Sequence, residues 1–250
     1  MSVSQLAAPA AIVVVAMSEE AAPFHAAATA SVELPLRVPA HALTVQGRRL
    51  WLVECNIGMV AAASALTQAL ELLAARHPGA AVPVVSAGTA GGLGVEVNVR
   101  DVCVSTALAY SEADARIFGY DLGQVPRQPA RFEADASLVA AARRAVPAAQ
   151  AGQEPPGAAA HFGLMLTGNS FVTAATAAQV RELFPGAVSV DMESVALAQV
   201  ARDYGLPFVS VRGVSDLCGP AADQEFHVGV DVAAARSATA VLALLETAAV

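Results

Sequence analysis

Residues 187–219, AVSVDMESVALAQVARDYGLPFVSVRGVSDLCG, predict a strand, a helix and a second strand in direct succession. The first strand is the short β-prone run 188–190, and 194–204 carries apolar side chains at helical spacing until Gly205 ends it. Residues 206–211 are again apolar and β-prone. Because a single helix joins them, we expect the two strands to lie parallel, with a right-handed crossover.

Polar residues gather where each of these two strands ends. The first cluster is Asp191, Met192 and Glu193, and the second is Arg212, Ser215 and Asp216. The carboxyl ends of parallel strands meet at one edge of an open α/β sheet, which is where small ligands bind in such folds. We therefore expect both clusters to face one ligand site. The alternative is that these residues are ordinary helix-start and loop charges.

Composition indicates that the whole chain forms one globular domain. Its 250 residues are 56% hydrophobic and 14% charged, which suits one domain, residues 1–250, with a sheet buried on both faces. The net charge is −8, and the 14 basic residues are all arginines scattered along the sequence. This charge balance argues against nucleic acid and against an anionic membrane as partners.

The cysteines and the N-terminus predict a location in the cell. Cys55, Cys103 and Cys218 are widely spaced and odd in number, which indicates neither a disulfide framework nor a metal site. The N-terminus lacks a positive region before its apolar run, and no apolar run is long enough to cross a bilayer. We expect a soluble, cytoplasmic protein.

Strands and helices alternate along the rest of the chain. The pattern predicts strands at 11–16, 82–86, 101–107 and 162–166, antiparallel strands within 32–56, helices at 58–75, 136–145, 174–183 and from 232 to the end, a loop at 109–133 and an exposed connection at 147–160. This order predicts a single α/β domain with a mixed, largely parallel central sheet flanked by helices.

The other apolar strands also end in polar or glycine-rich segments. These segments contain Glu19 and Glu20, a glycine-rich turn at 87–92 with Thr89 and Gly91, and the run Asn169, Ser170 and Phe171. Carboxylates, an arginine, hydroxyls, an aromatic ring and a thioether together suit a sugar that carries a flat heterocycle. No histidine joins the carboxylates or a candidate serine, so we expect neither a metal site nor a nucleophilic triad. The glycine-rich turn lacks the dinucleotide and Walker patterns, and no cofactor is expected.

Six segments carry a resemblance to a known family. They are AMSEE, SAGTAGGL, YSEADARIFGYDLGQVP, TGNSFV, VDMES and VRGVSD, in this order. Their order and spacing resemble those of the 5′-methylthioadenosine/S-adenosylhomocysteine nucleosidases of the purine nucleoside phosphorylase superfamily, over nearly the whole chain. The resemblance implies a three-layer nucleoside phosphorylase-like fold and hydrolysis of an N-glycosidic bond that releases adenine.

The resemblance also implies a role for each site residue. Asp216 looks like the general acid that protonates purine N7, and Glu20 looks like the general base on the attacking water. Arg212 and Thr89 would help to place that water. The remaining matches are substrate-binding positions: Glu193 and Met192 at the ribose, Phe171 and Val172 at the purine, and Asp191, Ser215, Gly91 and Tyr120 elsewhere in the site.

A further set of matches concerns the 5′-substituent and the subunit structure. Met17, Ile57 and Phe226 match residues of an apolar slot on one chain. Phe118 and Pro126 match residues that the neighbouring subunit contributes, which implies a homodimer with shared sites. The alternative is that these two residues only pack within their loop.

Three departures from the family leave the nucleoside open. The chain has Thr89 where the family often has Ser, Asn169 where it often has Asp, and Asp191 where it often has Glu. A nucleosidase for another nucleoside, of the aminofutalosine type, is one alternative. A phosphate-dependent phosphorylase is disfavoured because Glu19 and Glu20 would repel a phosphate dianion. A non-catalytic binding protein is the alternative from another class.

Overall fold

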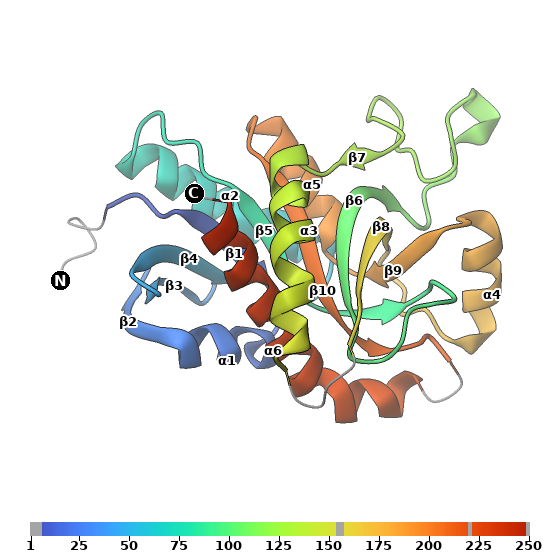
Figure 1. Ribbon diagram of the computed structural model, residues 1–250. Coiled ribbons are helices and arrows are strands. Elements are labelled where there is room, and N and C mark those ends of the chain that lie inside the picture. Colours follow the sequence, from blue (N-terminus) through green and yellow to red (C-terminus); the bar gives the residue numbers. More distant parts are fainter. Residues whose placement is uncertain (1–6, 154–157, 220–221, 249–250) are drawn as a thin grey trace.

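Helices cover both faces of one large sheet in the computed structural model (Figure 1). It describes residues 7–153, 158–219 and 222–248, and the side chains of 222–228 lie outside this description. The helices are α1 (Ser18–Ala27), α2 (Met59–Arg76), α3 (Ala136–Ala151), α4 (Ala174–Leu183), α5 (Ser194–Asp203) and α6 (Ala222–Thr247), with a 3₁₀ turn η2 (Arg116–Phe118).

The sheet has ten strands. They are β1 (Ala11–Val15), β2 (Ala28–Glu33), β3 (Ala40–Val45), β4 (Arg48–Glu54), β5 (Val84–Gly92), β6 (Val102–Tyr110), β7 (Phe132–Glu133), β8 (Ala160–Thr167), β9 (Ala187–Asp191) and β10 (Phe208–Asp216). The pairing order is β10-β6-β8-β9-β5-β1-β4-β3-β2, and β7 pairs with β6. Strand β10 also pairs with β5, so β5, β10, β6, β8 and β9 close into a ring.

The sheet is mixed, as predicted. Parallel pairing joins β4, β1, β5 and β10 in one block and β6, β8 and β9 in another. Antiparallel pairs join the two blocks, β10 to β6 and β5 to β9, and also form the β2–β3–β4 edge. The parallel character therefore belongs to the interior of each block.

The prediction that the strands of 187–219 lie parallel is wrong. Strand β9 is antiparallel to β5, whereas β10 is parallel to β5, so β9 and β10 run in opposite senses on the ring. The helix between them, α5, forms as expected, but it links strands that belong to different blocks. The right-handed crossover rule applies to parallel strands of one sheet. It does not apply to β9 and β10, because closure of the ring makes them run in opposite directions.

Two apolar cores lie on the two faces of the sheet. Alternate residues of β1 serve different cores, because successive side chains of a strand point to opposite faces. Ile12 and Val14 join a core with α2 and α5, while Val13 and Val15 join a core with α1, α3 and α6. Fully apolar strands are expected where helices cover both faces. The alternation confirms the three-layer arrangement.

Several segments extend further than their sequence pattern indicates. The glycine-rich stretch 87–92, predicted as a turn, continues strand β5, because β10 and β9 hydrogen-bond to it on both sides. Strand β10 likewise continues past 211 to Asp216, and β6 continues past 107 to Tyr110. The small residues of 87–92 have low β-propensity, and pairing with neighbouring strands extends all three segments.

The helices differ from the prediction as well. Glu19 and Glu20, predicted as polar residues that follow the first strand, lie in the first turn of α1, a helix that the sequence pattern did not indicate. Helix α3 continues through 147–151, the first part of the predicted exposed connection, and α6 begins ten residues before the predicted start at 232. Among the described residues, none of the helices combines the length and apolarity that a membrane span requires.

Candidate active site

One cavity of about 180 Å³ collects most of the residues that the sequence singled out. It lies where β1, β5, β9 and β10 end, together with the segment after β8. The predicted site residues in its wall are Met17, Glu20, Ile57, Thr89, Gly91, Phe171, Val172, Asp191, Met192, Glu193, Ser215 and Asp216. Ala16, Ala90, Ser170, Val190 and Cys218 complete the wall.

The Glu20 carboxylate is held by neutral donors. Its Oε1 accepts hydrogen bonds from the backbone nitrogen of Thr89, at 2.7 Å, and from the Thr89 hydroxyl, at 2.9 Å. Its Oε2 accepts from the backbone nitrogens of Ala16, at 2.8 Å, and Met17, at 3.3 Å. Only 1% of Glu20 is exposed, yet it lines the cavity. The side chain is therefore fixed in direction by two segments of the chain, the end of β1 and strand β5.

Gly88 lets strand β5 approach this carboxylate closely. A Cβ at this position would lie 2.4 Å from Glu20 Oε1, and the backbone has φ +127°, a conformation that suits glycine. The predicted glycine-rich segment therefore serves the site, although as a strand. It provides room for the Glu20 carboxylate, and the next residue, Thr89, supplies two donors to it.

Asp216 enters the same cavity from the end of β10. Its Oδ1 accepts a hydrogen bond from the backbone nitrogen of Cys218 at 2.9 Å, and its Oδ2 accepts one from the Ser215 hydroxyl at 3.0 Å. Asp216 is 2% exposed. The two carboxylates that the resemblance pairs, Glu20 and Asp216, are thus brought together in one cavity from opposite ends of the sequence.

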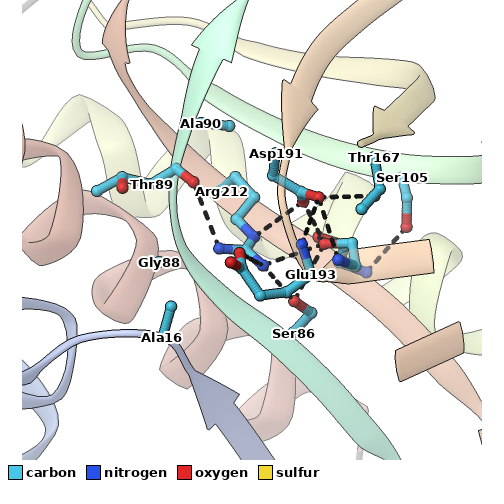
Figure 2. A network of polar contacts seen from close by, with 12 residues as sticks. Ala16, Ser86, Gly88, Thr89, Ala90, Ser105, Thr167, Asp191, Glu193 and Arg212 are labelled. Atoms are coloured by element: carbon cyan, nitrogen blue, oxygen red, sulfur yellow. Dashed lines mark hydrogen bonds and ion pairs between the residues drawn. The ribbon is translucent and has the colours of Figure 1, made fainter. Parts of the chain in front are cut away.

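A third carboxylate belongs to a charged network at the end of β9 (Figure 2). Arg212 Nε lies 3.2 Å from Asp191 Oδ2, and Arg212 Nη2 lies 3.4 Å from Glu193 Oε2. The other Glu193 oxygen accepts a hydrogen bond from the backbone nitrogen of Gly58 at 2.9 Å. One cation therefore serves two buried carboxylates.

Burial raises the pKa of Glu193 to about 7. The neighbouring Arg212 acts in the opposite direction, and the Asp191 charge adds to the rise. Arg212 lies within 3.4 Å of both Asp191 and Glu193, so one guanidinium charge is shared between two carboxylates. For Arg212 itself, burial lowers the pKa, but the carboxylates of Asp191 and Glu193 more than offset this and raise it. The network thus places a titratable carboxylate on the cavity wall.

Arg212 lies behind the cavity wall, not among the described residues that line it. It is 1% exposed, and Nη2 donates to the Ser86 hydroxyl at 2.7 Å and to the Ser194 hydroxyl at 3.2 Å. Its Nη1 donates to the Thr89 carbonyl at 3.3 Å. Arg212 thus contacts Glu193 and Thr89 from behind the wall, and its help in placing the attacking water, which the resemblance implies, stays a prediction.

Serine and threonine residues that sequence reasoning did not single out complete this network. The Asp191 carboxylate accepts hydrogen bonds from the Thr167 hydroxyl, at 2.7 Å, and from the Ser194 hydroxyl. Ser194 also lies 2.8 Å from the Ser210 hydroxyl. Ser194 directly follows Glu193 in the sequence, which is the one local signal that pointed to it.

The mouth of the cavity is apolar and partly open. Phe171 is 47% exposed and Ile57 is 54% exposed, while Val172 beside them is buried. Glu112 holds the segment before Phe171, because its carboxylate accepts hydrogen bonds from the backbone nitrogens of Ser170, at 3.1 Å, and Asn169, at 3.4 Å. An exposed aromatic ring at the mouth offers a face for a flat heterocycle.

Besides Arg212, three predicted residues do not line this cavity in the described structure. Phe118 is 78% exposed on η2, and Tyr120 and Pro126 lie in the following loop, outside the described residues that line the cavity. Phe226 falls within α6, but its side chain lies outside the described part of the structure. In the ranges 7–153, 158–219 and 222–248, no group of three histidine, cysteine or acidic side chains is arranged to hold a metal.

Comparisons with known proteins place this chain in a family. The model of the phosphorylase superfamily matches residues 10–248. The 5′-methylthioadenosine/S-adenosylhomocysteine nucleosidase of Chromohalobacter salexigens is 36% identical over 207 residues, 82% of this chain and 83% of the relative.

Solved structures agree with this relationship. The nucleosidase of the same name from Neisseria meningitidis, in complex with methylthio-immucillin-A, has a TM-score of 0.84 and 34% identity, covering 94% of this chain and 98% of that one. The nucleosidase from Colwellia psychrerythraea, in complex with adenine, has a TM-score of 0.86 and 32% identity, covering 96% of both chains.

Proposed function

We propose that this chain, which belongs to the 5′-methylthioadenosine/S-adenosylhomocysteine nucleosidase family of the phosphorylase superfamily, hydrolyses the N-glycosidic bond of 5′-substituted adenine nucleosides. The observation that carries the proposal is one cavity whose wall contains Glu20, Asp216 and Glu193. Each carboxylate has a different set of partners, which suits three different tasks at one substrate.

The reaction divides between Glu20 and Asp216. Protonated Asp216 gives its proton to purine N7 as the C1′–N9 bond breaks and its electron pair leaves with adenine. Glu20 takes a proton from the water whose oxygen bonds to C1′. The products are adenine and the 5′-substituted ribose, and the two carboxyl groups regain their starting states by exchanging protons with solvent. General acid and general base steps each contribute about 10²- to 10⁴-fold.

The remaining wall residues hold the nucleoside. Ionised Glu193 accepts hydrogen bonds from the ribose hydroxyls, with Met192 beside it, and the charge that develops on the ribose favours a nearby carboxylate. Phe171 stacks on the purine, and the Val172 backbone bonds to its edge. The 5′-substituent lies toward Met17 and Ile57, on the apolar side of the cavity.

Water is the nucleophile that this site favours over phosphate. The cavity presents the carboxylates of Glu20, Glu193 and Asp216, which repel a phosphate dianion. The contacts of the buried Arg212 guanidinium go to Asp191, Glu193, hydroxyls and a carbonyl, behind the wall. A phosphorylase needs such a cation at the anion itself.

A homodimer in the cytoplasm completes the proposal. Ile117 and Phe118 are adjacent, 88% and 78% exposed, and large apolar side chains exposed together favour a contact surface. A neighbouring copy would receive Phe118, Tyr120 and Pro126 at the mouth of its own cavity. The three cysteines are buried free thiols, which suits a reducing compartment.

The decisive experiment measures adenine release from methylthioadenosine with and without phosphate. We expect equal rates in both, and strict dependence on phosphate would overturn the hydrolase assignment. A panel of S-adenosylhomocysteine, 5′-deoxyadenosine, aminofutalosine, adenosine and inosine then identifies the preferred nucleoside. Adenine binding without turnover of any of them would indicate a binding protein instead.

A further inference from the structure

We propose that Ser237 on helix α6 is a positioning residue for the general base, acting on Glu20 through the backbone of strand β5. The inference rests on the proposed function, because it assigns Ser237 a part in the same reaction. Ser237 is fully buried and is not among the described residues that line the cavity.

The Ser237 hydroxyl bridges two strands of the ring. Its oxygen accepts a hydrogen bond from the backbone nitrogen of Gly88, at 2.9 Å, and its proton goes to the carbonyl of Val211, at 2.8 Å. Gly88 belongs to β5 and Val211 to β10, which pair in parallel with Val211 beside Ala87. One buried side chain thus bonds a backbone donor of one strand and a backbone acceptor of the next.

Close packing of α6 on β10 brings the hydroxyl to this position. A Cβ on Gly213 would lie 2.0 Å from the carbonyl oxygen of Ala233, so only glycine allows the helix to come so near. Ser237 follows Ala233 by four residues and therefore lies on the same face of the helix. The approach of α6 to the sheet thus places Ser237 against the strands.

The bridge matters because Gly88 carries the geometry of the general base. Its α-carbon faces the Glu20 carboxylate at close range, and its positive φ aims the next residue, Thr89, at Glu20 Oε1. Without the Ser237 hydroxyl, the Gly88 nitrogen loses its partner and this part of β5 relaxes. The two Thr89 donors then hold Glu20 less firmly, and activation of the water suffers.

The test compares Ser237→Thr with Ser237→Val. The two replacements have nearly the same shape, and only threonine keeps a hydroxyl, so any packing cost is common to both. We expect the valine variant to lose about 10- to 100-fold in kcat relative to the threonine variant, the range expected for an unpaired buried backbone group. KM for methylthioadenosine and Kd for adenine should stay within about twofold, because the residues proposed to hold the nucleoside, such as Glu193 and Phe171, keep their contacts.

A matched control removes a buried hydroxyl elsewhere in the ring. Ser189→Ala on β9 deletes a fully buried hydroxyl that lies outside the cavity wall, and we expect wild-type kcat from it. Equal kcat in the threonine and valine variants of an active enzyme would overturn the role of Ser237 alone. Inactivity of the wild-type chain on every nucleoside would overturn the proposed function together with it. Comparable losses in kcat and adenine affinity would indicate a structural role and would also refute the proposal.

Discussion

Two buried carboxylates of the same cavity, Glu20 and Glu193, are held in different ways. Glu20 receives its hydrogen bonds from neutral donors, three backbone nitrogens and a hydroxyl. Glu193 has one backbone donor, from Gly58, and a guanidinium that it shares with Asp191. Both are at least 95% buried, so the difference lies in the partners and not in exposure.

The difference shows how two carboxylates in one cavity can have different functions. Neutral donors fix the direction of the Glu20 oxygens without a formal countercharge. A shared guanidinium only partly compensates the burial of Glu193, and its pKa rises to about 7. Pairs of carboxyl groups in contrasting environments are a known basis for dividing acid, base and binding roles.

Replacing the general base should have the largest effect. We expect Glu20→Gln to lower kcat by about 10²- to 10⁴-fold, or about 3–5 kcal/mol in the barrier, because the amide cannot take the proton of water. Asp216→Asn should lose a similar factor by removing the proton for N7. Rates of adenine release measure both.

Affinity for adenine is the control for these two variants. Each should bind adenine with a Kd close to that of the wild type, because the ring still meets Phe171. A Glu20→Gln enzyme with more than a tenth of wild-type kcat would contradict the role of the general base.

A methyl group at Gly88 should disturb the Glu20 carboxylate and leave Glu193 unaffected. The Cβ of Gly88→Ala would meet the Glu20 carboxylate at 2.4 Å, at a φ of +127°. We expect a loss of about 2–5 kcal/mol in the free energy of unfolding, from backbone strain and overpacking, together with a lower kcat. Chemical denaturation and adenine release measure the two effects.

Gly205→Ala is the matched control for this variant. Gly205 also has a positive φ, +69°, but a Cβ there meets nothing within 4 Å. It should cost only about 1 kcal/mol and leave kcat unchanged. Equal losses in the two variants would show that the space beside Glu20 is unimportant.

Glu193→Gln should change the pH dependence of stability. The folded protein binds the Glu193 proton more tightly than the unfolded chain, since burial raises its pKa from 4.5 to about 7. This contribution is therefore fully present below about pH 4.5 and is lost as the pH rises through 7. Glutamine should flatten the decline by about 1–3 kcal/mol across that window.

Denaturation at several pH values measures the slope for Glu193→Gln. The exposed carboxylate of Glu19 provides the control, and Glu19→Gln should keep the wild-type slope. An unchanged slope in Glu193→Gln would mean that Arg212 neutralises Glu193 fully in the folded state. Glu193 would then stay ionised over this pH range, and the proposed contrast between Glu193 and Glu20 would not hold.

The smallest effect concerns the mouth of the cavity. We expect Phe118→Ala to lower kcat/KM by about tenfold, or about 1.4 kcal/mol, through loss of an apolar contact to the 5′-substituent in the neighbouring site. Mixing Phe118→Ala with Asp216→Asn should raise the activity above the sum of the two. A mixed dimer has one site with wild-type Asp216 and a wild-type partner loop. Strict additivity after subunit exchange would place Phe118 in its own site.

The sequence predicted which residues form the site better than it predicted the directions of the strands that carry them. The residues of VDMES and VRGVSD do meet, as the strand-end argument expected. The stated reason was wrong, because β9 and β10 run in opposite senses, and Arg212 lies within its strand and not after it. Local patterns identify strands, but the closure of a ring depends on pairings between distant segments.

The same limit applies to the glycine-rich segment and to Glu20. Glycine and alanine have low strand propensity, so 87–92 read as a turn, and only the flanking β10 and β9 made it a strand. The helix that carries Glu20 was not predicted, because α1 contains Pro23 and lacks a clear apolar stripe.

The sequence by itself determined the alternation of strands and helices, the buried character of the sheet and the types of chemical group at the strand ends. Tertiary structure alone decided that Glu20 meets Thr89, 69 residues away, and that Ser237 meets Gly88 across 149 residues. Propensity and periodicity act over a few neighbouring residues. Hydrogen bonds between layers form only when packing has fixed the distance between them, and no local pattern records that distance.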